Sequence, residues 1–412
     1  MADHFDTLEI RDPEVREREL LAALPRQIAH ATANAPAFAR LFDGVDAASI
    51  ATRAALAALP VTRKSALLEL QKSVRPFGGL ATTHWGDAAR VFASPGSIYE
   101  PEGRRPDYWR LARALFAAGF RRGDLVHNCF SYHFTPAGSM LETGALALGC
   151  TVFPAGTGQT EQQVQAMADL MPAGYIGTPS FLKIILEKAD EMGAPLPSLV
   201  KALVSAEAFP KSLCDALLAR GIAGYQVYAT ADLGSIAYET EARQGLVVDE
   251  GVLVELVRPG TGDPVGPGEV GEVVVTSLFN TDYPLIRFGT GDLSAVMPGR
   301  SPCGRTNVRI KGWMGRADQT TKVKGMFVHP AQVAAIVARH PEIAKARLVV
   351  DNATGADRMT LQVEVPDNRS SNADAIVASI RDITKLRGEI AFHPSGALPN
   401  DGKVIDDVRK YD

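Results

Sequence analysis

The sequence predicts an α/β protein in which a large N-terminal α/β body precedes a small, mobile α+β domain. Between about 108 and 232, short apolar stretches alternate with segments at helical spacing, which is typical of a largely parallel sheet. After Asp232 the helical pattern stops, and Val-rich stretches joined by Pro/Gly turns indicate an antiparallel β subdomain. From near Gly315 strands and helices alternate again over about 95 residues, a usual size for a separate domain.

We therefore expect a body over 1–316, with the β subdomain from about 233, and a C-terminal lid domain over 317–412. The body starts with helices, because Leu20, Leu24 and Ile28 recur at helical spacing within 14–30. The expected helices of the sheet region span 108–118, 140–148, 160–170, 179–192 and 211–220, and the strands 125–130, 151–153, 174–177, 199–205 and 225–229. Strands 251–257 and 269–278 follow in the β subdomain, then helices 330–339 and 373–387 and strands 347–350, 360–365 and 389–393 in the lid.

Composition excludes several classes of protein. The 43 basic and 47 acidic residues give a net charge of −4, which provides no global field for nucleic acid or an anionic membrane. The N-terminal segment is charged, and no apolar run reaches the roughly 20 residues of a membrane span. The four cysteines lie far apart without a CxxC pair, so neither a disulfide framework nor a Cys-rich zinc site is indicated. We expect a soluble, cytoplasmic protein without nucleic-acid or membrane partners.

Three segments carry residues suited to chemistry. Lys403 follows a glycine in the turn 398–403, where its charge could reach a phosphate or carboxylate held elsewhere. Asp292 follows Thr-Gly and could accept hydrogen bonds from two vicinal hydroxyls. A third segment, 315–318, precedes a Thr-Thr-Lys run. Taken singly, these residues are equally explained as a surface lysine, a turn that caps a strand end and a charged linker.

In this order and spacing, the segments resemble the adenylate-forming superfamily of acyl-coenzyme A synthetases, luciferases and peptide-synthetase adenylation domains. Within it, the chain most resembles the phenylacetate–coenzyme A ligase family. The matching segments reach from 123 to 403, about two-thirds of the chain, and each is weak alone. They include 122–124, 148–154, 158–160, 177–180, 205–208, 284–287, 289–292, 303–306 and 315–318.

The resemblance implies roles around the nucleotide. Asp292 would hold the ribose hydroxyls of ATP, with Arg316 assisting, and Tyr228 would stack on the adenine. Arg287 would lie near the phosphates, where a cation is favourable. The other residues expected to border the nucleotide are Ser205, Ala206, Glu207, Ala229 and Thr230.

For the C-terminal domain, the resemblance implies that Asp318 is the hinge about which the domain rotates. Lys403 would bridge the acyl carboxylate and the α-phosphate during adenylation and then leave the site. Gly325 would line the pantetheine route of coenzyme A, because a missing side chain lets the thiol approach.

The chain departs from the family pattern in its phosphate loop. A Ser/Thr/Gly run followed by lysine is expected, but the corresponding segment is 92–101, Phe-Ala-Ser-Pro-Gly-Ser-Ile-Tyr-Glu-Pro. Ser94, Gly96 and Ser97 could donate hydrogen bonds to phosphate, whereas Pro95 has no N–H and the lysine is absent.

Two further departures concern metals. The family segment Tyr-Gly-x-x-Glu reads 228–232 here and ends in Asp232, which would bind Mg²⁺ with a carboxylate that is one methylene shorter. Some relatives carry a Cys/His metal cluster in the β subdomain. Thr240 and Val247 stand at the expected Cys and His positions, and only Cys303 remains. We therefore expect no structural zinc.

The resemblance places the acyl pocket at 130–138. Tyr132, His133 and Phe134 could form an aromatic wall beside Gly138, although the residues alone allow two of the aromatic side chains to be core residues. An aromatic acid is expected over a long fatty acid, because the resemblance is to the aryl-acid branch.

The resulting prediction is an ATP-dependent acid–thiol ligase. Carboxylate attack on the α-phosphate brings two anions together, so Mg²⁺, Lys403 and backbone N–H groups must neutralise the charge. Coenzyme A would then accept the acyl group, and AMP and pyrophosphate would be released. Two alternatives stay open, an adenylating enzyme with a carrier-protein or amine acceptor and a non-catalytic nucleotide-binding relative. The sequence does not decide the oligomeric state, a homodimer included.

Overall fold

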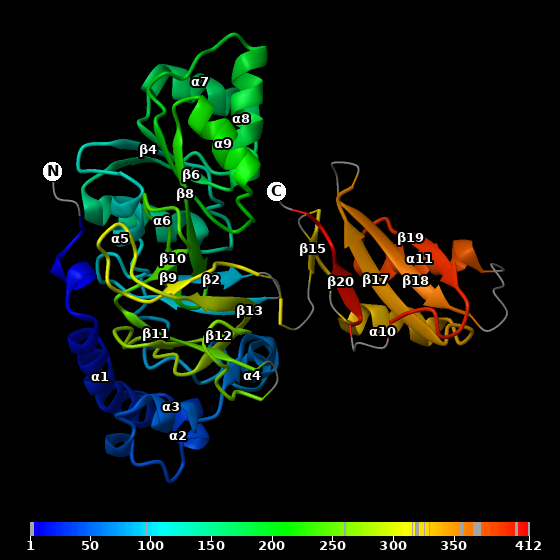
Figure 1. Cartoon of the computed structure of the whole chain (residues 1–412), viewed down its shortest axis with the longest axis horizontal. Coiled ribbons are helices and arrows are strands. Elements are labelled where there is room, and N and C mark those ends of the chain that lie inside the picture. The colour runs from blue at the N-terminus through cyan, green and yellow to red at the C-terminus, as the bar shows by residue number, and fades with distance from the viewer. Residues whose placement is uncertain are drawn as a thin grey trace. The chain divides into compact units, whose positions relative to one another are not determined.

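The computed structural model describes residues 4–94, 97–258, 261–314, 316–317, 321–324, 326–328, 330–353, 357–365, 372–399 and 403–410. The chain divides into two compact units, Met1–Met314 and Gly315–Asp412 (Figure 1). The expected boundary at 316/317 lies two residues beyond this division.

The first unit opens with the predicted helices. The long helix α1 (Pro13–Asn34) begins where the Asp12 carboxylate accepts hydrogen bonds from the N–H groups of Glu14 and Val15 at 2.9 and 3.1 Å. Leu20, Leu24 and Ile28 are buried on one face, which confirms the expected spacing. One short element, η1 (Thr7–Ile10), precedes α1. Five short elements come after it: α2 (Pro36–Leu41), η2 (Ala47–Ser49), α3 (Arg53–Ala57), η3 (Lys64–Ala66) and α4 (Leu67–Ser73).

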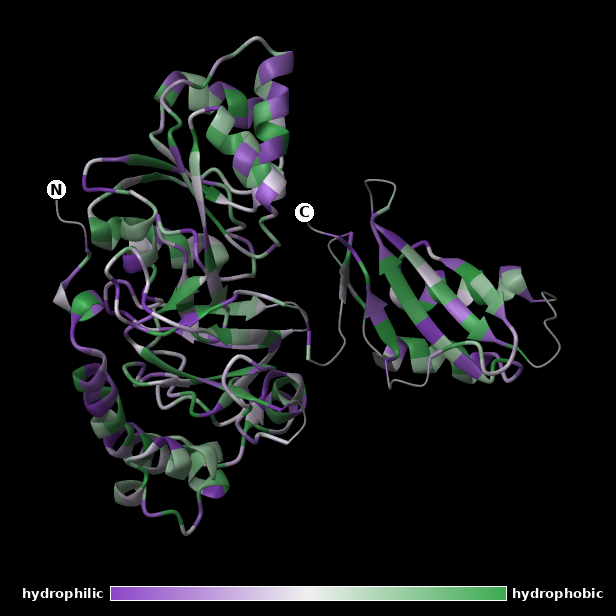
Figure 2. Ribbon diagram, in the orientation of Figure 1, coloured by the Kyte–Doolittle hydropathy of each residue, from purple (hydrophilic) through white to green (hydrophobic). Residues whose placement is uncertain are grey.

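The predicted parallel sheet is also present. Its strands β4 (Leu125–Asn128), β5 (Thr151–Phe153), β6 (Gly174–Gly177), β7 (Lys201–Val204) and β8 (Ala223–Thr230) are parallel in the order β8-β7-β6-β4-β5. The connecting helices are α5 (Ala112–Ala117), α6 (Ala137–Leu148), α7 (Thr160–Leu170), α8 (Pro179–Glu191) and α9 (Lys211–Ala219). Figure 2 shows hydrophobic residues along the strands and a mixed surface on α8, which covers the sheet with one face.

The predicted antiparallel strands are present, and most of their buried residues pack with the N-terminal helices in one hydrophobic cluster. These strands continue the same sheet, in the order β11-β12-β13-β14-β10-β9-β8, because β9 pairs with β8. Their bounds are β9 (Gly234–Tyr238), β10 (Leu246–Val248), β11 (Val252–Val257), β12 (Val270–Ser277), β13 (Phe288–Met297) and β14 (Arg309–Ile310). The sequence thus predicted β11 and β12 as strands. The parallel and antiparallel parts belong to one sheet, in which the strand direction changes between β8 and β9.

Two short additions complete the first unit. The two-residue strand β1 (Thr62–Arg63) pairs in parallel with β13, with Thr62 opposite Phe288 and Arg63 opposite Gly289. A hairpin of β2 (Arg90–Ser94) and β3 (Ile98–Glu102) contains the predicted phosphate loop at its turn. Both bring residues from the N-terminal third of the chain to the sheet.

The second unit has the expected α+β elements. A four-stranded sheet runs in the order β19-β18-β17-β20, and β15 and β16 form a separate pair. The elements are β15 (Thr321–Val323), β16 (Met326–Val328), α10 (Pro330–Arg339), β17 (Lys345–Asp351), β18 (Arg358–Glu364), α11 (Ala373–Thr384), β19 (Glu389–His393) and β20 (Ile405–Asp407). Ile336 of α10 and Ile380 of α11 are buried with Val350 and Leu361 of the sheet, so the unit has its own core. In neither unit do the described residues include a helix that is both long and apolar enough to cross a membrane.

Candidate active site

Asp292 lies on β13 with its carboxylate held by two aromatic donors. Tyr228, on β8, donates its hydroxyl hydrogen to Oδ2 at 2.9 Å, and the Trp313 indole donates to Oδ1 at 3.1 Å. The backbone N–H of Asp292 donates to the Thr290 hydroxyl at 3.1 Å. The structure thus brings together the predicted pair of Asp292 and Tyr228, while the Tyr228 hydroxyl orients the carboxylate.

Trp313 was not identified from the sequence. It lies just after β14, and 44% of its surface is exposed, which is unusual for so large an apolar side chain. Its position directly before a predicted domain boundary was the one feature of the sequence that could have drawn attention to it. Its partner, Asp292, is 21 residues earlier, and the pairing of β13 with β14 brings the two together.

Lys64 and Asp232 form a second pair near Asp292. The pairing of β1 with β13 carries Lys64 alongside the Thr290–Asp292 stretch, and Asp232 follows the end of β8. The Lys64 ammonium lies 2.5 Å from Asp232 Oδ2. Asp232 is buried, and its other oxygen, Oδ1, has no hydrogen-bond partner among the described residues. Sequence reasoning missed Lys64, because its segment carries no recognisable motif.

Glu100 joins this pair from the β2–β3 hairpin. It is fully buried, and its oxygens accept hydrogen bonds from the Ser94 hydroxyl at 2.5 Å and the Ser94 N–H at 3.3 Å. Burial, assisted by the charge of Asp232, raises the pKa of Glu100 to about 8. Burial alone would lower the pKa of Lys64, but the charges of Asp232 and Glu100 outweigh it and raise that pKa above its ordinary value. At neutral pH Lys64 is therefore a cation beside the Asp232 carboxylate.

The predicted phosphate loop is only partly described. The Ser94 donors go to Glu100, and Ser97 is exposed with a φ of 59° at the far side of the turn. Gly96 lies outside the described residues. The expectation that Ser94 offers its donors to phosphate therefore does not match the contacts that this side chain makes.

The structure corrects the role predicted for Arg287. This side chain is buried, and its Nε and Nη2 atoms face the two oxygens of Glu255, both at 3.1 Å. Its remaining N–H groups donate to backbone oxygens, those of Ala57 and Gly262 at 2.7 Å and that of Leu59. A guanidinium with this many acceptors anchors the N-terminal helices to the sheet. Its charge is neutralised by Glu255, so a phosphate contact is not supported.

The residues predicted to border the adenine meet at the carboxyl edge of the parallel strands. Ser205, Ala206 and Glu207 follow β7, and the Ser205 hydroxyl donates to the Val227 oxygen of β8 at 2.7 Å. Ala206 and Glu207 are exposed. On β8 itself, the Thr230 hydroxyl accepts a hydrogen bond from the N–H of Leu233 at 3.2 Å, and Ala229 precedes it. Ligands of open α/β sheets bind at this edge, and here it is also where strand direction changes.

The predicted aromatic wall of the acyl pocket is only partly built. Asn128, at the end of β4, donates to the Tyr132 hydroxyl at 2.8 Å and to the Gly138 oxygen at 2.9 Å. A Cβ atom at Gly138 would lie 2.7 Å from the Ser131 oxygen and 3.0 Å from the Tyr132 ring, so the glycine is needed for this close packing. His133 and Phe134 are exposed, Phe134 to 82%. Of the three aromatic residues, Tyr132 alone is partly buried.

The remaining predicted site residues belong to the second unit. Lys403 lies two residues before β20, and its exposed ammonium lies 2.9 Å from Asp406 Oδ1. Arg316 lies near the start of this unit, and its ribose contact stays a prediction. Asp318 and Gly325 lie outside the described residues.

At the position where some relatives bind a metal, the side chains form other contacts. Thr240 and Val247 are buried, and Cys303 Sγ lies 3.0 Å from the Ser301 hydroxyl. Burial raises the pKa of the Cys303 thiol, but hydrogen bonds from Ser301, Thr240 and Arg305 outweigh it and leave the pKa below its ordinary value. In the described part of the chain, no three or more His, Cys, Asp and Glu residues gather in a way that could hold a metal ion.

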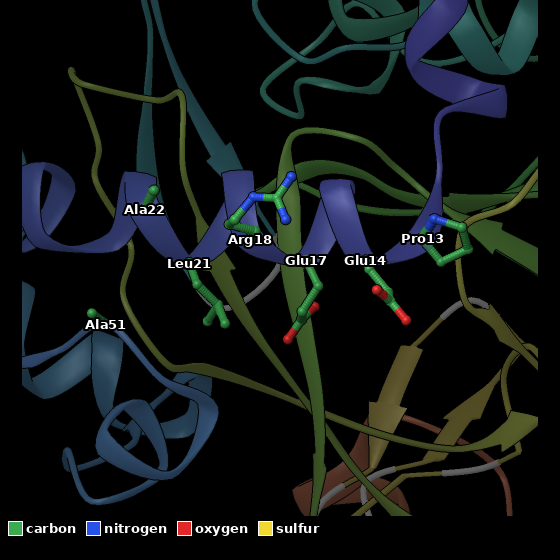
Figure 3. A pocket seen from close by; sticks show the side chains of 7 residues that line it. All are labelled: Pro13, Glu14, Glu17, Arg18, Leu21, Ala22 and Ala51. Carbon is green, nitrogen blue, oxygen red and sulfur yellow. The ribbon is translucent and has the colours of Figure 1, made fainter.

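A depression of about 650 Å³ runs along α1, where Glu14, Glu17 and Leu21 point to one side and face Ala51 (Figure 3). It shares no residue with the site described above and is largely open to solvent. We therefore assign this depression no role in the activity.

Comparison with known proteins decides the family. The AMP-binding enzyme family matches residues 108–281. A phenylacetate–coenzyme A ligase from Aromatoleum evansii is 32% identical over 84% of this chain and 80% of its own length. A second, from Thermus thermophilus, is 32% identical over 92% and 90%. The chain belongs to the phenylacetate–coenzyme A ligase family.

Solved structures agree on the fold of this family member. A 2-hydroxyisobutyryl-coenzyme A ligase, solved with its acyl-adenylate and coenzyme A, superposes with a TM-score of 0.80 at 22% identity, over 100% of this chain and 93% of the other. At that identity the likeness speaks for the fold alone. The predictions of family, fold class and enzyme class are thereby confirmed, while the roles of single residues stay predictions.

Proposed function

We propose that this protein joins a small aromatic carboxylic acid to coenzyme A through an acyl-adenylate, converting ATP to AMP and pyrophosphate. As a member of the phenylacetate–coenzyme A ligase family, it is an AMP-forming acyl-coenzyme A ligase. The observation that carries the activity is 32% identity to phenylacetate–coenzyme A ligases over most of both chains. The aromatic acid and a cytoplasmic location are parts of the proposal that go beyond family membership.

In this proposal, Asp292 accepts hydrogen bonds from the ribose hydroxyls of ATP. An ionised carboxylate suits that task, because it offers two acceptor oxygens and no donor. Tyr228 and Trp313 keep the carboxylate in one orientation, so little conformational freedom remains to be lost when the nucleotide binds. Ser205, Ala206 and Glu207 border the adenine at the adjacent strand end.

The residues around Asp232 fit a magnesium ion. Asp232 Oδ1 is buried without a hydrogen-bond partner among the described residues, and the Thr230 hydroxyl is on the preceding strand. Mg²⁺ prefers such oxygen donors and is usually held by one or two carboxylates together with phosphate oxygens. We propose that Asp232 holds the ion, which when bound neutralises charge on the phosphates.

Lys403 is proposed to contact both the acyl carboxylate and the α-phosphate while the acyl–phosphate bond forms and the bond to pyrophosphate breaks. Arg316 would add a contact to the ribose, Asp318 would act as the hinge and Gly325 would line the thiol route. In the second half-reaction the coenzyme A thiolate attacks the acyl carbon, and AMP leaves with the electron pair of the broken bond. That step does not require Lys403.

The first experiment measures exchange of labelled pyrophosphate into ATP with Mg²⁺ and a panel of small carboxylic acids. Acid-dependent exchange, strongest with arylacetic or benzoic acids and followed by thioester formation with coenzyme A, is the expected result. If exchange occurs and the enzyme then forms amides with amine acceptors but no thioester with coenzyme A, the acceptor is an amine and not coenzyme A. Absence of exchange with every acid would support the non-catalytic alternative.

Lys403→Ala separates the two half-reactions. We expect the variant to lose pyrophosphate exchange by on the order of 100-fold or more, and to convert a supplied acyl-adenylate to thioester at nearly the normal rate. Lys385→Ala is a matched control, because Lys385 is also an exposed lysine paired with an aspartate three residues away in the same unit. Equal loss of both half-reactions in Lys403→Ala would contradict a role confined to adenylation.

A further inference from the structure

Lys64, Glu100 and Asp232, here called the Lys64 cluster, are three ionisable residues from distant parts of the chain. Lys64 follows β1, Glu100 lies on β3 and Asp232 follows β8. Lys64 Nζ lies 2.5 Å from Asp232 Oδ2, and the charges of Glu100 and Asp292 also act on it. The cluster therefore connects the phosphate-loop hairpin, the proposed magnesium ligand and the proposed ribose ligand.

The loop segment 92–101, which should cradle phosphate, contains no basic residue. Pro95 also removes one backbone donor. At its base, Ser94 donates to Glu100 rather than to an outside group. A triphosphate placed beside Asp292 and Asp232 would meet two carboxylates, whose repulsion must be offset by a positive charge.

Lys64 has the position and the chemistry to provide that charge. Its ammonium has three N–H donors, and the hydrogen bond it makes to a described residue goes to Asp232. About 24% of its side chain is exposed, so a ligand can reach it from solvent. The other oxygen of the same carboxylate, Asp232 Oδ1, is buried without a hydrogen-bond partner among the described residues, so it keeps acceptor capacity beside the ammonium.

We propose that Lys64 binds the β- and γ-phosphates of ATP and so replaces the lysine that the phosphate loop lacks. Asp232 is the positioning residue that fixes the ammonium through Oδ2, and Glu100 fixes the base of the hairpin through Ser94. The proposal rests on ATP being the substrate, as proposed above, but it concerns phosphate binding and not the identity of the acid.

The test is titration calorimetry of the full chain with ATP and, separately, with AMP, each in Mg²⁺ and in EDTA. Removing a charged hydrogen bond from a phosphate costs roughly 10- to 100-fold in affinity. Lys64→Met should therefore weaken ATP binding by about that factor and leave AMP binding within about twofold, with or without Mg²⁺. Lys64→Arg should recover part of the ATP affinity, because it restores the charge.

Lys72→Met is the matched control. Lys72 is an exposed lysine on the neighbouring helix α4, paired with Glu69, and its loss should change neither affinity. Since Lys64→Met leaves Asp232 buried without its cation, the double variant Lys64→Met/Asp232→Asn removes both charges and keeps the comparison valid if the single variant unfolds. Like the single variant, the double variant should lose ATP affinity and keep AMP affinity.

Two results would overturn the proposal. One is a Lys64→Met protein that retains normal ATP affinity, and the other is an equal loss of ATP and AMP affinity, which would indicate a general change of the site. A wild-type protein that binds ATP no better than AMP would also overturn it. If ATP binding depends on Lys64 while no acid supports pyrophosphate exchange, the ligase function fails and this inference stands.

Discussion

Two buried charge clusters of the first unit contain one basic residue each, and they are completed in different ways. The guanidinium of Arg287 donates hydrogen bonds to Glu255 and to three backbone oxygens. Around Lys64, a single carboxylate oxygen of Asp232 accepts the hydrogen bond, and the second oxygen of that carboxylate is left without one among the described residues. Four acceptors surround the guanidinium of Arg287, whereas the ammonium of Lys64 has N–H donors left for another group. We call these the closed and the open cluster.

This difference separates a structural charge from a functional one. A buried carboxylate oxygen without a hydrogen-bond partner costs roughly 1–3 kcal/mol. Asp232 Oδ1 shares this state with Glu255 Oε1 among the described residues, so the two clusters differ in the number of acceptors around the cation. Arg287 occupies a motif that resembles a phosphate-binding one, yet its acceptors are already in place. Lys64 occupies no recognised motif, yet its ammonium has N–H donors left for a ligand.

The largest expected effect is on stability in the closed cluster. Arg287→Met would leave Glu255 buried without its cation, and we expect the free energy of unfolding to fall by about 3–5 kcal/mol. Chemical denaturation measures this, with Arg220→Met as the control, since Arg220 pairs with the exposed Asp190 and should cost less than about 1 kcal/mol. A variant as stable as the control that has lost ATP affinity would reverse our assignment of Arg287.

In the open cluster, Asp232→Asn should affect activity far more than stability. We expect pyrophosphate exchange to fall by on the order of 100-fold, because the amide cannot carry the negative charge that holds Mg²⁺. Added Mg²⁺ should restore part of the rate. Asp215→Asn is the control, as Asp215 forms an exposed pair with Lys211 on α9. The proposal is contradicted if Asp232→Asn loses as much stability as Arg287→Met while the folded variant keeps normal pyrophosphate exchange. Asp232 would then stabilise the fold and not bind the ion.

Glu100 gives the open cluster a pH signature. Its pKa of about 8 means that the folded protein keeps a proton that the unfolded chain releases near pH 4. The unfolding free energy of the wild type should therefore fall relative to Glu100→Gln as pH rises from about 4.5 to 8, by about 1 kcal/mol per pH unit. Denaturation at pH 5, 6 and 7 measures the slope, and Glu69→Gln, exposed on α4, should follow the wild type. A pH-independent difference would show that Glu100 is ionised in the fold.

The smallest expected effect lies at the edge of the open cluster, where Trp313 orients Asp292. Trp313→Phe removes one donor to the carboxylate, and we expect the KM for ATP to rise about threefold. The effect should vanish with 2′,3′-dideoxyATP, which has no ribose hydroxyls for Asp292 to accept. Trp85→Phe, at another exposed tryptophan, is the control. An effect of equal size with both nucleotides would contradict a ribose role for Asp292.

Local patterns were sufficient for most of the fold. The spacing of Leu20, Leu24 and Ile28 predicted α1, and the short apolar stretches predicted the parallel strands, because burial of one face repeats at short range along the chain. The same patterns did not predict that the antiparallel strands continue the parallel sheet. Strand patterns do not name partners, and the pairing of β8 with β9 depends on the turn between them.

The candidate site was predicted less completely. Asp292, Tyr228 and Asp232 were found because they stand in family segments, and the structure brings Asp292 of β13 into contact with Tyr228 of β8, while Asp232 follows the end of β8. Lys64 was missed because the strand directly before it, β1, has two residues and no periodicity. The exposed positions of His133 and Phe134 likewise could not be read from the sequence, since an aromatic run after a strand is equally compatible with a wall of a pocket and with a surface loop.

The sequence by itself determined the family, the order of helices and strands, and the side chains at the ends of the parallel strands, because these depend on neighbouring residues. Only the tertiary structure decided which charges meet. Pairing of β1 with β13 brings Lys64 to Asp232, and packing of the N-terminal helices surrounds Arg287 with acceptors. The physical reason is that a buried charge takes its role from the partners around it, and those partners come from segments that are distant in the chain.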